Sequence, residues 1–139
     1  MKVAVVYWSG TGNTEAMANA VASGAAEAGA EVQMFGASEF NSNMVAEFDS
    51  IAFGCPSMGV EELEDSEFQP MFDDVKGSLS GKKVALFGSY GWGDGEWMRT
   101  WQADCESAGI SLVADGLIVN EAPDDEAVKN CQGLGKSLA

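Results

Sequence analysis

The stretch VAVVYWSGTGNTEAMANAV, residues 3–21, decides the fold that we expect for this chain. It runs from an apolar segment through a loop of glycine, hydroxyl and amide residues, Ser9–Thr14, into an alanine-rich segment with a small-residue face at helical spacing. Two glycines let the loop backbone approach a ligand, and the free N–H groups at a helix start attract anions. Strand, loop and helix in this order predict a phosphate site, with a well-capped strand-to-helix turn as the alternative.

This phosphate loop, Ser9–Thr14, differs from three other loops that bind phosphates. A nucleotide-hydrolysing loop needs Gly-Lys-Ser/Thr, but here Gly12 is followed by Asn13. A dinucleotide-binding loop needs a third glycine, where Glu15 stands, and a cysteine phosphatase loop needs an arginine that does not follow Cys55. The phosphate loop therefore suits a phosphate monoester that is bound by neutral donors alone.

Apolar runs suited to buried parallel strands alternate with helical patterns along the chain. The expected strands are Val3–Trp8, Val32–Phe35, Ser50–Gly54, Val84–Gly88 and Leu112–Val119. The expected helices are Thr14–Ala28, Glu64–Val75, Glu96–Ala108 and Asp124–Leu138. Pro70 either divides the second helical segment or places its start near Gln69.

This alternation predicts an α/β fold in one domain, residues 1–139, with a doubly wound five-stranded parallel sheet and right-handed crossovers. Five strands favour the order 2-1-3-4-5 over the other common doubly wound order. Both orders bind ligands at the carboxyl ends of the strands, where the strand order reverses. The phosphate loop should therefore share one edge of the sheet with the loops that follow the other strands.

Composition limits the classes of partner. The chain has 22 acidic and 7 basic residues, a formal net charge of -15, and an apolar fraction of 46%. Nucleic acids and anionic membranes need clustered Lys or Arg, so we expect neither as a partner, and a positively charged partner instead. Cys55, Cys105 and Cys131 form no CxxC pair and histidine is absent, so we expect buried thiols and no metal site. Without a leader or a membrane-spanning run, we expect a cytoplasmic monomer.

Two further loops follow expected strands, GCPSMGVEELEDSEF (residues 54–68) and LFGSYGWGDGEW (residues 86–97). Met58 stands beside a glycine, and Trp92 stands between two glycines that have no side chains to cover it. Large polarizable side chains in such loops can clamp a flat aromatic ligand. Trp97 and Trp101, one helical turn apart, are expected in the core, and Trp8 is expected to be a packing residue.

At this point the chain resembles the short-chain flavodoxins over its whole length. The resemblance rests on SGTGNT after the first strand, SMG-x-E after the third, SYGWGDGEW after the fourth and NEAPD after the fifth. It implies FMN as a non-covalently bound cofactor, with Ser9 to Thr14 on the phosphate and Met58 and Trp92 on opposite faces of the ring. It further implies Gly59 at flavin N5, Glu61 accepting the N3 proton, Asn120 near the ring, and the backbone of Ser89, Tyr90 and Gly91 at the pyrimidine side. The phosphate loop residues are Ser9, Gly10, Thr11, Gly12, Asn13 and Thr14.

The resemblance implies a low-potential one-electron carrier that stabilises a neutral semiquinone, with no catalytic residue of its own. Half of the acidic residues fall in or just after the three later cofactor-edge loops, so basic faces of redox proteins are the expected partners. The main alternative is an FMN-dependent NAD(P)H quinone or nitro reductase of the same fold. A phosphoryl-accepting receiver domain is a remote alternative, because Gly54-Cys55-Pro56 stands where its aspartate would be.

Val60 departs from the pattern that a type II turn over residues 58–61 requires. Such a turn needs a positive φ at its third residue, which β-branched valine disfavours. We therefore expect a different turn, or a loop whose carbonyl already points toward flavin N5.

Overall fold

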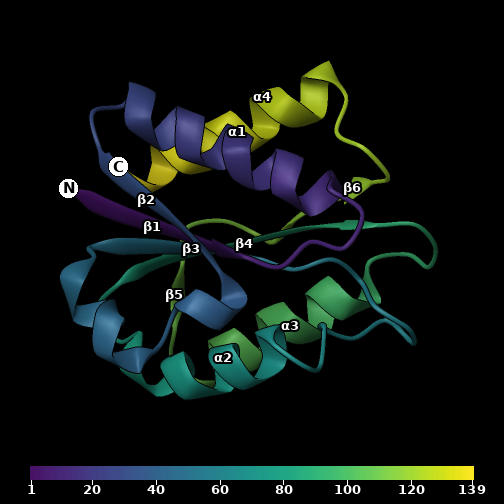
Figure 1. The fold of residues 1–139 in the computed structure, drawn as a ribbon, viewed down its shortest axis with the longest axis horizontal. Coiled ribbons are helices and arrows are strands. Elements are labelled where there is room, and N and C mark those ends of the chain that lie inside the picture. Colours follow the sequence, from purple (N-terminus) through teal and green to yellow (C-terminus); the bar gives the residue numbers. More distant parts are fainter.

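The computed structural model describes all residues, 1–139, and contains one parallel sheet between two layers of helices (Figure 1). The strands are β1 (Lys2–Tyr7), β2 (Glu31–Gly36), β3 (Ser50–Gly54), β4 (Lys83–Tyr90), β5 (Ser111–Leu112) and β6 (Leu117–Asn120). The α-helices are α1 (Asn13–Glu27), α2 (Phe68–Val75), α3 (Glu96–Ser107) and α4 (Asp125–Leu138). Short 3-10 turns η1 (Ala37–Glu39), η2 (Ser42–Glu47) and η3 (Lys76–Ser78) complete the chain.

The strand order is β2-β1-β3-β4-β5, with β6 also beside β4, so the predicted order 2-1-3-4-5 is confirmed. The fifth strand, however, is divided. Ser111 and Leu112 pair with the start of β4, and Leu117–Asn120 pair with its end. Between them the chain leaves the sheet, and here Gln102 of α3 accepts the Gly116 N–H (2.8 Å) and donates to Asp115 (3.1 Å).

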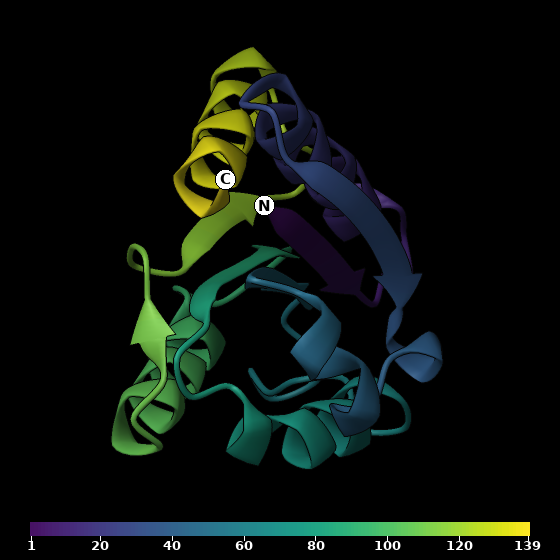
Figure 2. The same cartoon turned by 90° about the vertical axis from the view of Figure 1, so that its left-hand side faces the viewer.

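Each face of the sheet carries its own apolar core. Figure 2 shows the two helix layers that cover these faces, α1 and α4 on one side and α2 and α3 on the other. Successive residues of β1 alternate between them: Ala4 and Val6 face the side of α2 and α3, while Val3 and Val5 face α1 and α4. All four are fully buried, as expected for a parallel sheet that is covered on both faces. Strand β1, buried on both faces, therefore fixes the position of the phosphate loop that follows it.

Helices α1 and α4 approach closely where both have glycine. A Cβ atom at Gly24 would lie 2.0 Å from the backbone oxygen of Gln132, and one at Gly135 would lie 2.0 Å from that of Val21. The small-residue face that the sequence predicts for α1 thus meets α4 as well as the sheet. This contact leaves no room for any side chain on either helix at these positions.

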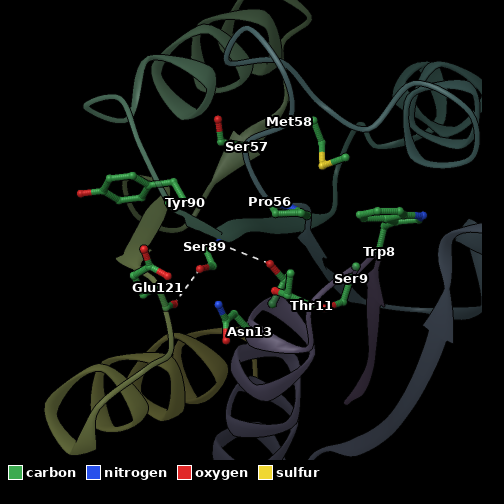
Figure 3. Close-up of a pocket in the computed structure, with 13 residues that line it drawn as sticks. Trp8, Ser9, Thr11, Asn13, Pro56, Ser57, Met58, Ser89, Tyr90 and Glu121 are labelled. Carbon is green, nitrogen blue, oxygen red and sulfur yellow. Dashed lines mark hydrogen bonds between the residues drawn. The ribbon is translucent and has the colours of Figure 1, made fainter.

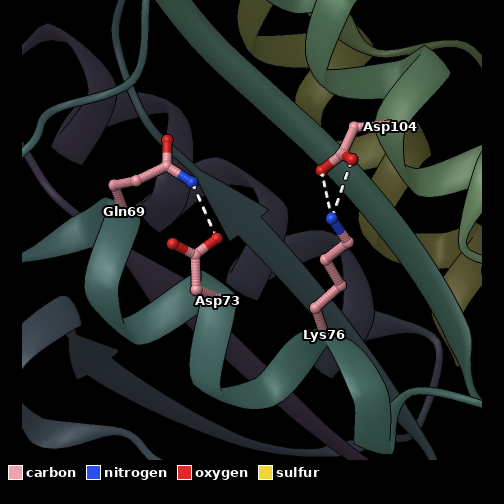
Figure 4. Close-up of polar contacts among 4 residues, drawn as sticks. All are labelled: Gln69, Asp73, Lys76 and Asp104. Atoms are coloured by element: carbon pink, nitrogen blue, oxygen red, sulfur yellow. Dashed lines mark hydrogen bonds and ion pairs between the residues drawn. The ribbon is translucent and has the colours of Figure 1, made fainter.

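On the opposite face, an ion pair joins η3, which directly follows α2, to α3. The Lys76 ammonium lies 2.7 Å from Asp104 Oδ1, and Gln69 and Asp73 form a hydrogen bond within α2 (Figure 4). Trp97 and Trp101 are buried, as predicted, and the indole N–H of Trp97 donates to the Cys55 carbonyl (3.1 Å).

All three cysteines are buried and free, as predicted. Burial raises the pKa of the Cys55 thiol to about 12, so this thiol stays protonated at neutral pH. None of the helices combines the length and the hydrophobicity needed to cross a bilayer.

Helix α2 begins at Phe68, four residues after the start of the predicted segment, which confirms the second interpretation of Pro70, a helix that begins near Gln69. The carboxylate of Glu64 caps this helix start. The Glu64 carboxylate accepts the N–H groups of Ser66, Glu67 and Phe68 at 2.8–2.9 Å, and the Ser66 hydroxyl as well. Burial raises the pKa of this carboxyl, but these hydrogen bonds outweigh it and lower the pKa to about 2. Pro70 lies in the first turn of α2, where no intrahelical N–H is needed.

Glu64→Gln is expected to destabilise the fold in a pH-dependent way. The folded pKa lies below the unfolded one, so the stabilisation is present above the unfolded pKa and is lost as pH falls through the folded one. A shift from 4.5 to about 2 corresponds to about 3 kcal/mol at pH 7, falling to roughly 1 kcal/mol at pH 3. Urea unfolding of both proteins at each pH measures this difference. The control is Glu106→Gln, an exposed side chain in α3; a Glu64→Gln penalty that is equal at both pH values contradicts the assignment.

Candidate functional site

An open cavity of about 240 Å³ lies at the carboxyl ends of β1, β3, β4 and β6, where the strand order predicts a ligand (Figure 3). Its lining comes from four loops that are far apart in the sequence. The lining residues are Trp8, Ser9, Gly10, Thr11, Asn13, Thr14, Pro56, Ser57, Met58, Ser89, Tyr90, Gly91 and Glu121. The structure thus brings the phosphate loop together with Met58 and the loop after β4.

The side chain of Ser9, the first residue of the phosphate loop, fixes the conformation of the loop backbone. Ser9 Oγ accepts the N–H groups of Gly12 (3.1 Å) and Glu15 (3.2 Å), and Gly12 has a left-handed φ of 97°. The N–H groups of the other loop residues, Gly10, Thr11, Asn13 and Thr14, donate to no group of the protein. The loop is therefore both a capped helix start and a set of free donors at the cavity.

The floor of the cavity is a hydrogen-bonded chain of three elements. The Ser89 N–H of β4 donates to the hydroxyl of Thr14 (3.4 Å), which is 1% exposed, and the Ser89 hydroxyl donates to the Glu121 carbonyl (2.7 Å; Figure 3). Glu121 has a positive φ of 61°, and its N–H donates to the Tyr90 carbonyl (2.8 Å). These two bonds hold the left-handed backbone at Glu121.

The loop after β3 is a three-residue loop closed by two backbone bonds. Met58 and Glu62 exchange N–H to O hydrogen bonds of 2.8 and 3.0 Å. Positive φ values fall on Gly59 (48°) and Glu61 (56°), and Val60 has none. This agrees with the expectation that valine avoids the left-handed position of a type II turn, and the loop is a different turn.

The side-chain carboxylate of Glu61 contacts the N-terminus of α3. Its Oε1 accepts the Glu96 N–H (3.0 Å), and its carboxyl carbon is 2.6 Å from where a Cβ at Gly93 would be. The unpaired N–H groups and the dipole of a helix start explain this position. Glu61 thereby joins the loop after β3 to the loop after β4.

Five predicted site residues do not line the cavity. They are Gly12, Gly59, Glu61, Trp92 and Asn120. The Trp92 side chain is 62% exposed, and the Asn120 amide donates to the Tyr90 carbonyl (3.3 Å). Their contacts with a ligand stay predictions.

Four cavity residues were not among the predicted site residues. Pro56 and Ser57 stand directly before Met58, and Glu121 is the second residue of the NEAPD motif, so position beside a recognised residue was the available signal. Trp8, expected to be a packing residue, both packs against the core and lines the cavity. No group of three or more His, Cys, Asp or Glu side chains is arranged to hold a metal ion.

Comparisons with known proteins match nearly the whole chain to one protein family. The flavodoxin family model matches residues 5–132. The chain is 50% identical to a flavodoxin of Megasphaera elsdenii over 99% of this chain and 98% of that protein, and 47% identical to one of Clostridium beijerinckii over 97% of both. The solution structure of two-electron reduced Megasphaera elsdenii flavodoxin superposes with a TM-score of 0.89 over 98% of this chain and 97% of that chain. The chain belongs to the flavodoxin family.

Proposed function

We propose that the chain carries single electrons between redox proteins, with FMN bound in the cavity at the carboxyl edge of the sheet. As a flavodoxin it is an electron-transfer protein, and FMN is the cofactor of its family. The observation that carries the proposal is the division of the cavity lining. Free amide donors of the phosphate loop line one part of the cavity, and Pro56, Met58 and the Trp8 ring, which lies between that loop and Met58, form an apolar wall beside them.

The donors fit a phosphate monoester. The cavity has no lysine or arginine, but the hydroxyl and amide side chains of Ser9, Thr11 and Asn13 line it beside the free loop amides. Neutral donors at a helix start bind an anion through several oriented dipoles. FMN supplies one- and two-electron redox chemistry when bound.

The apolar wall and the neighbouring loops would hold the ring. Met58 lines the cavity, and the exposed Trp92 indole, flanked by glycines, is free to close over a ligand from the loop after β4. Gly59 has the left-handed freedom that the loop needs beside the ring. Glu61 binds the Glu96 N–H through Oε1, which leaves Oε2 to accept a ring N–H, and Asn120 stands at the end of β6 nearby.

Binding of FMN tests the proposal directly. Titrating the purified apoprotein with FMN should quench flavin fluorescence and saturate at one FMN per chain, because the ring enters an apolar cavity beside aromatic side chains. Unchanged FMN fluorescence at excess protein contradicts the proposal.

Basic faces of redox proteins are the partners that the charge distribution favours. Glu62, Asp94 and Glu121 are exposed at the cavity edge, while Lys2 and Lys83 begin β1 and β4 at the opposite edge. The resulting field directs positively charged surfaces toward the cofactor edge.

A net charge of -15 opposes self-association, so we infer that the protein acts as a monomer. We infer that residues 1–139 form one domain. We also infer a cytoplasmic location, which the three free thiols support.

Electron transfer to a basic redox protein should therefore slow as salt is added. Raising the ionic strength from about 0.01 to 0.15 M shortens the screening length from roughly 30 to 8 Å, and a fall in the association rate of tenfold or more is expected. Stopped-flow rates at several salt concentrations measure this. A rate that does not change with salt excludes electrostatic steering.

A further inference from the structure

Trp8 is more than a packing residue, because its ring lies between two loops of the cavity. A Cβ at Gly10 would lie 3.1 and 3.3 Å from two atoms at the far edge of the indole ring, so the phosphate loop rests directly on that ring. Across the cavity, the end of the Met58 side chain points toward Trp8 (Figure 3). The position of the Trp8 ring therefore affects both the phosphate loop and the part of the cavity beside Met58.

The ring of Trp8 is itself fixed by a distant residue. Its backbone N–H donates to the Gly54 carbonyl (3.0 Å), and its indole N–H donates to Glu67 Oε1 (3.1 Å), 59 positions further along the chain. Glu67 is the residue before α2, and its own N–H is held by the Glu64 carboxylate (2.8 Å). The acceptor is thus part of an ordered helix cap, and its position is set by α2.

We propose that Trp8 and Glu67 form a link that positions the phosphate loop for the cofactor. The link holds the indole ring under Gly10, and the ring keeps the loop amides directed at the cavity. Trp8 and Glu67 are positioning residues, and α2 contributes to cofactor binding through them without reaching the cavity. This inference rests on the proposed function, since the loop is the proposed phosphate site.

Four variants and one control test the link. Glu67→Ala removes the acceptor. Trp8→Phe removes the N–H together with the ring atoms that lie under Gly10, and the double variant removes donor and acceptor. Glu67→Gln keeps an acceptor oxygen without the charge. Asp65→Asn, an exposed neighbour, controls for the loss of one negative charge.

Each of the two single variants, Glu67→Ala and Trp8→Phe, is expected to weaken FMN binding about fivefold or more in a fluorescence titration, the effect of losing one ordinary hydrogen bond. The double variant should bind no more weakly than Trp8→Phe alone, because Trp8→Phe already removes the donor of the hydrogen bond to Glu67. Glu67→Gln and Asp65→Asn should stay within about twofold of the original chain. In the apoprotein, the Gly10 amide and Trp8 indole N–H resonances should shift in Glu67→Ala and return in Glu67→Gln.

Wild-type affinity in Glu67→Ala, with both resonances unmoved, overturns the link. Effects of the two single variants that multiply in the double variant overturn it as well. If the original chain binds no FMN, the proposed function fails, while the two apoprotein resonances still decide whether Glu67 positions Trp8 and Gly10.

Discussion

Replacing Gly24 by alanine should destabilise the chain by about 3 kcal/mol or more, the upper range for overpacking in a core. The added Cβ would lie 2.0 Å from the backbone oxygen of Gln132, so α1 and α4 must separate. Gly135→Ala places its Cβ 2.0 Å from the Val21 oxygen and should have a similar effect. The measurement is the urea midpoint of the apoprotein.

Gly133→Ala is the matched control, since Gly133 lies in α4 with Gly135 and its Cβ would meet nothing within 4 Å. This variant should be stabilised by about 0.5–1 kcal/mol, because alanine is the better helix former. Equal unfolding midpoints for Gly24→Ala and Gly133→Ala would mean that the helices do not touch through these glycines.

Thr11→Asp should lower the affinity for FMN by at least about 100-fold. Thr11 lines the cavity in the phosphate loop, where no cation offsets an added carboxylate. Two unit charges 4 Å apart repel by about 4 kcal/mol at the effective dielectric near a protein surface, and a phosphate monoester carries up to two negative charges. A factor of 100 needs only about 2.8 kcal/mol, which allows for screening.

Two controls separate the effect of the added negative charge at position 11 from the effect of the changed side-chain shape. Thr11→Asn, neutral and of similar size, should bind FMN within about tenfold of the original chain, since one neutral hydrogen bond is worth about 1 kcal/mol. Riboflavin, which lacks the phosphate, should lose little affinity for Thr11→Asp. Equal losses of FMN and riboflavin in Thr11→Asp would place the phosphate elsewhere.

The strand order and the phosphate loop were predictable because both depend on local pattern. Apolar runs mark buried strands, and the glycine and hydroxyl residues of Ser9–Thr14 stand directly between a strand and a helix. The cofactor edge then follows from topology, since parallel strands end at the same side of the sheet.

Features that depend on contacts between distant residues were not predictable. The gap between β5 and β6 coincides with the hydrogen bonds that Gln102 of α3 forms with Asp115 and Gly116. The place of Glu61 in the SMG-x-E motif predicted a contact with the cofactor. The sequence did not predict that Glu61 accepts the N–H of Glu96, 35 residues further along the chain. Nothing local in the sequence indicates such pairings.

Stepwise reduction of the FMN-loaded protein, followed by absorption spectroscopy, tests the central claim most directly. A one-electron carrier must separate the two reduction steps of its cofactor, which its protein environment does by stabilising the neutral one-electron-reduced form over the anionic two-electron form. The account predicts that the spectrum of the neutral one-electron-reduced flavin appears first and dominates at half reduction. Conversion of oxidised to fully reduced flavin in one step, without that spectrum, would contradict it.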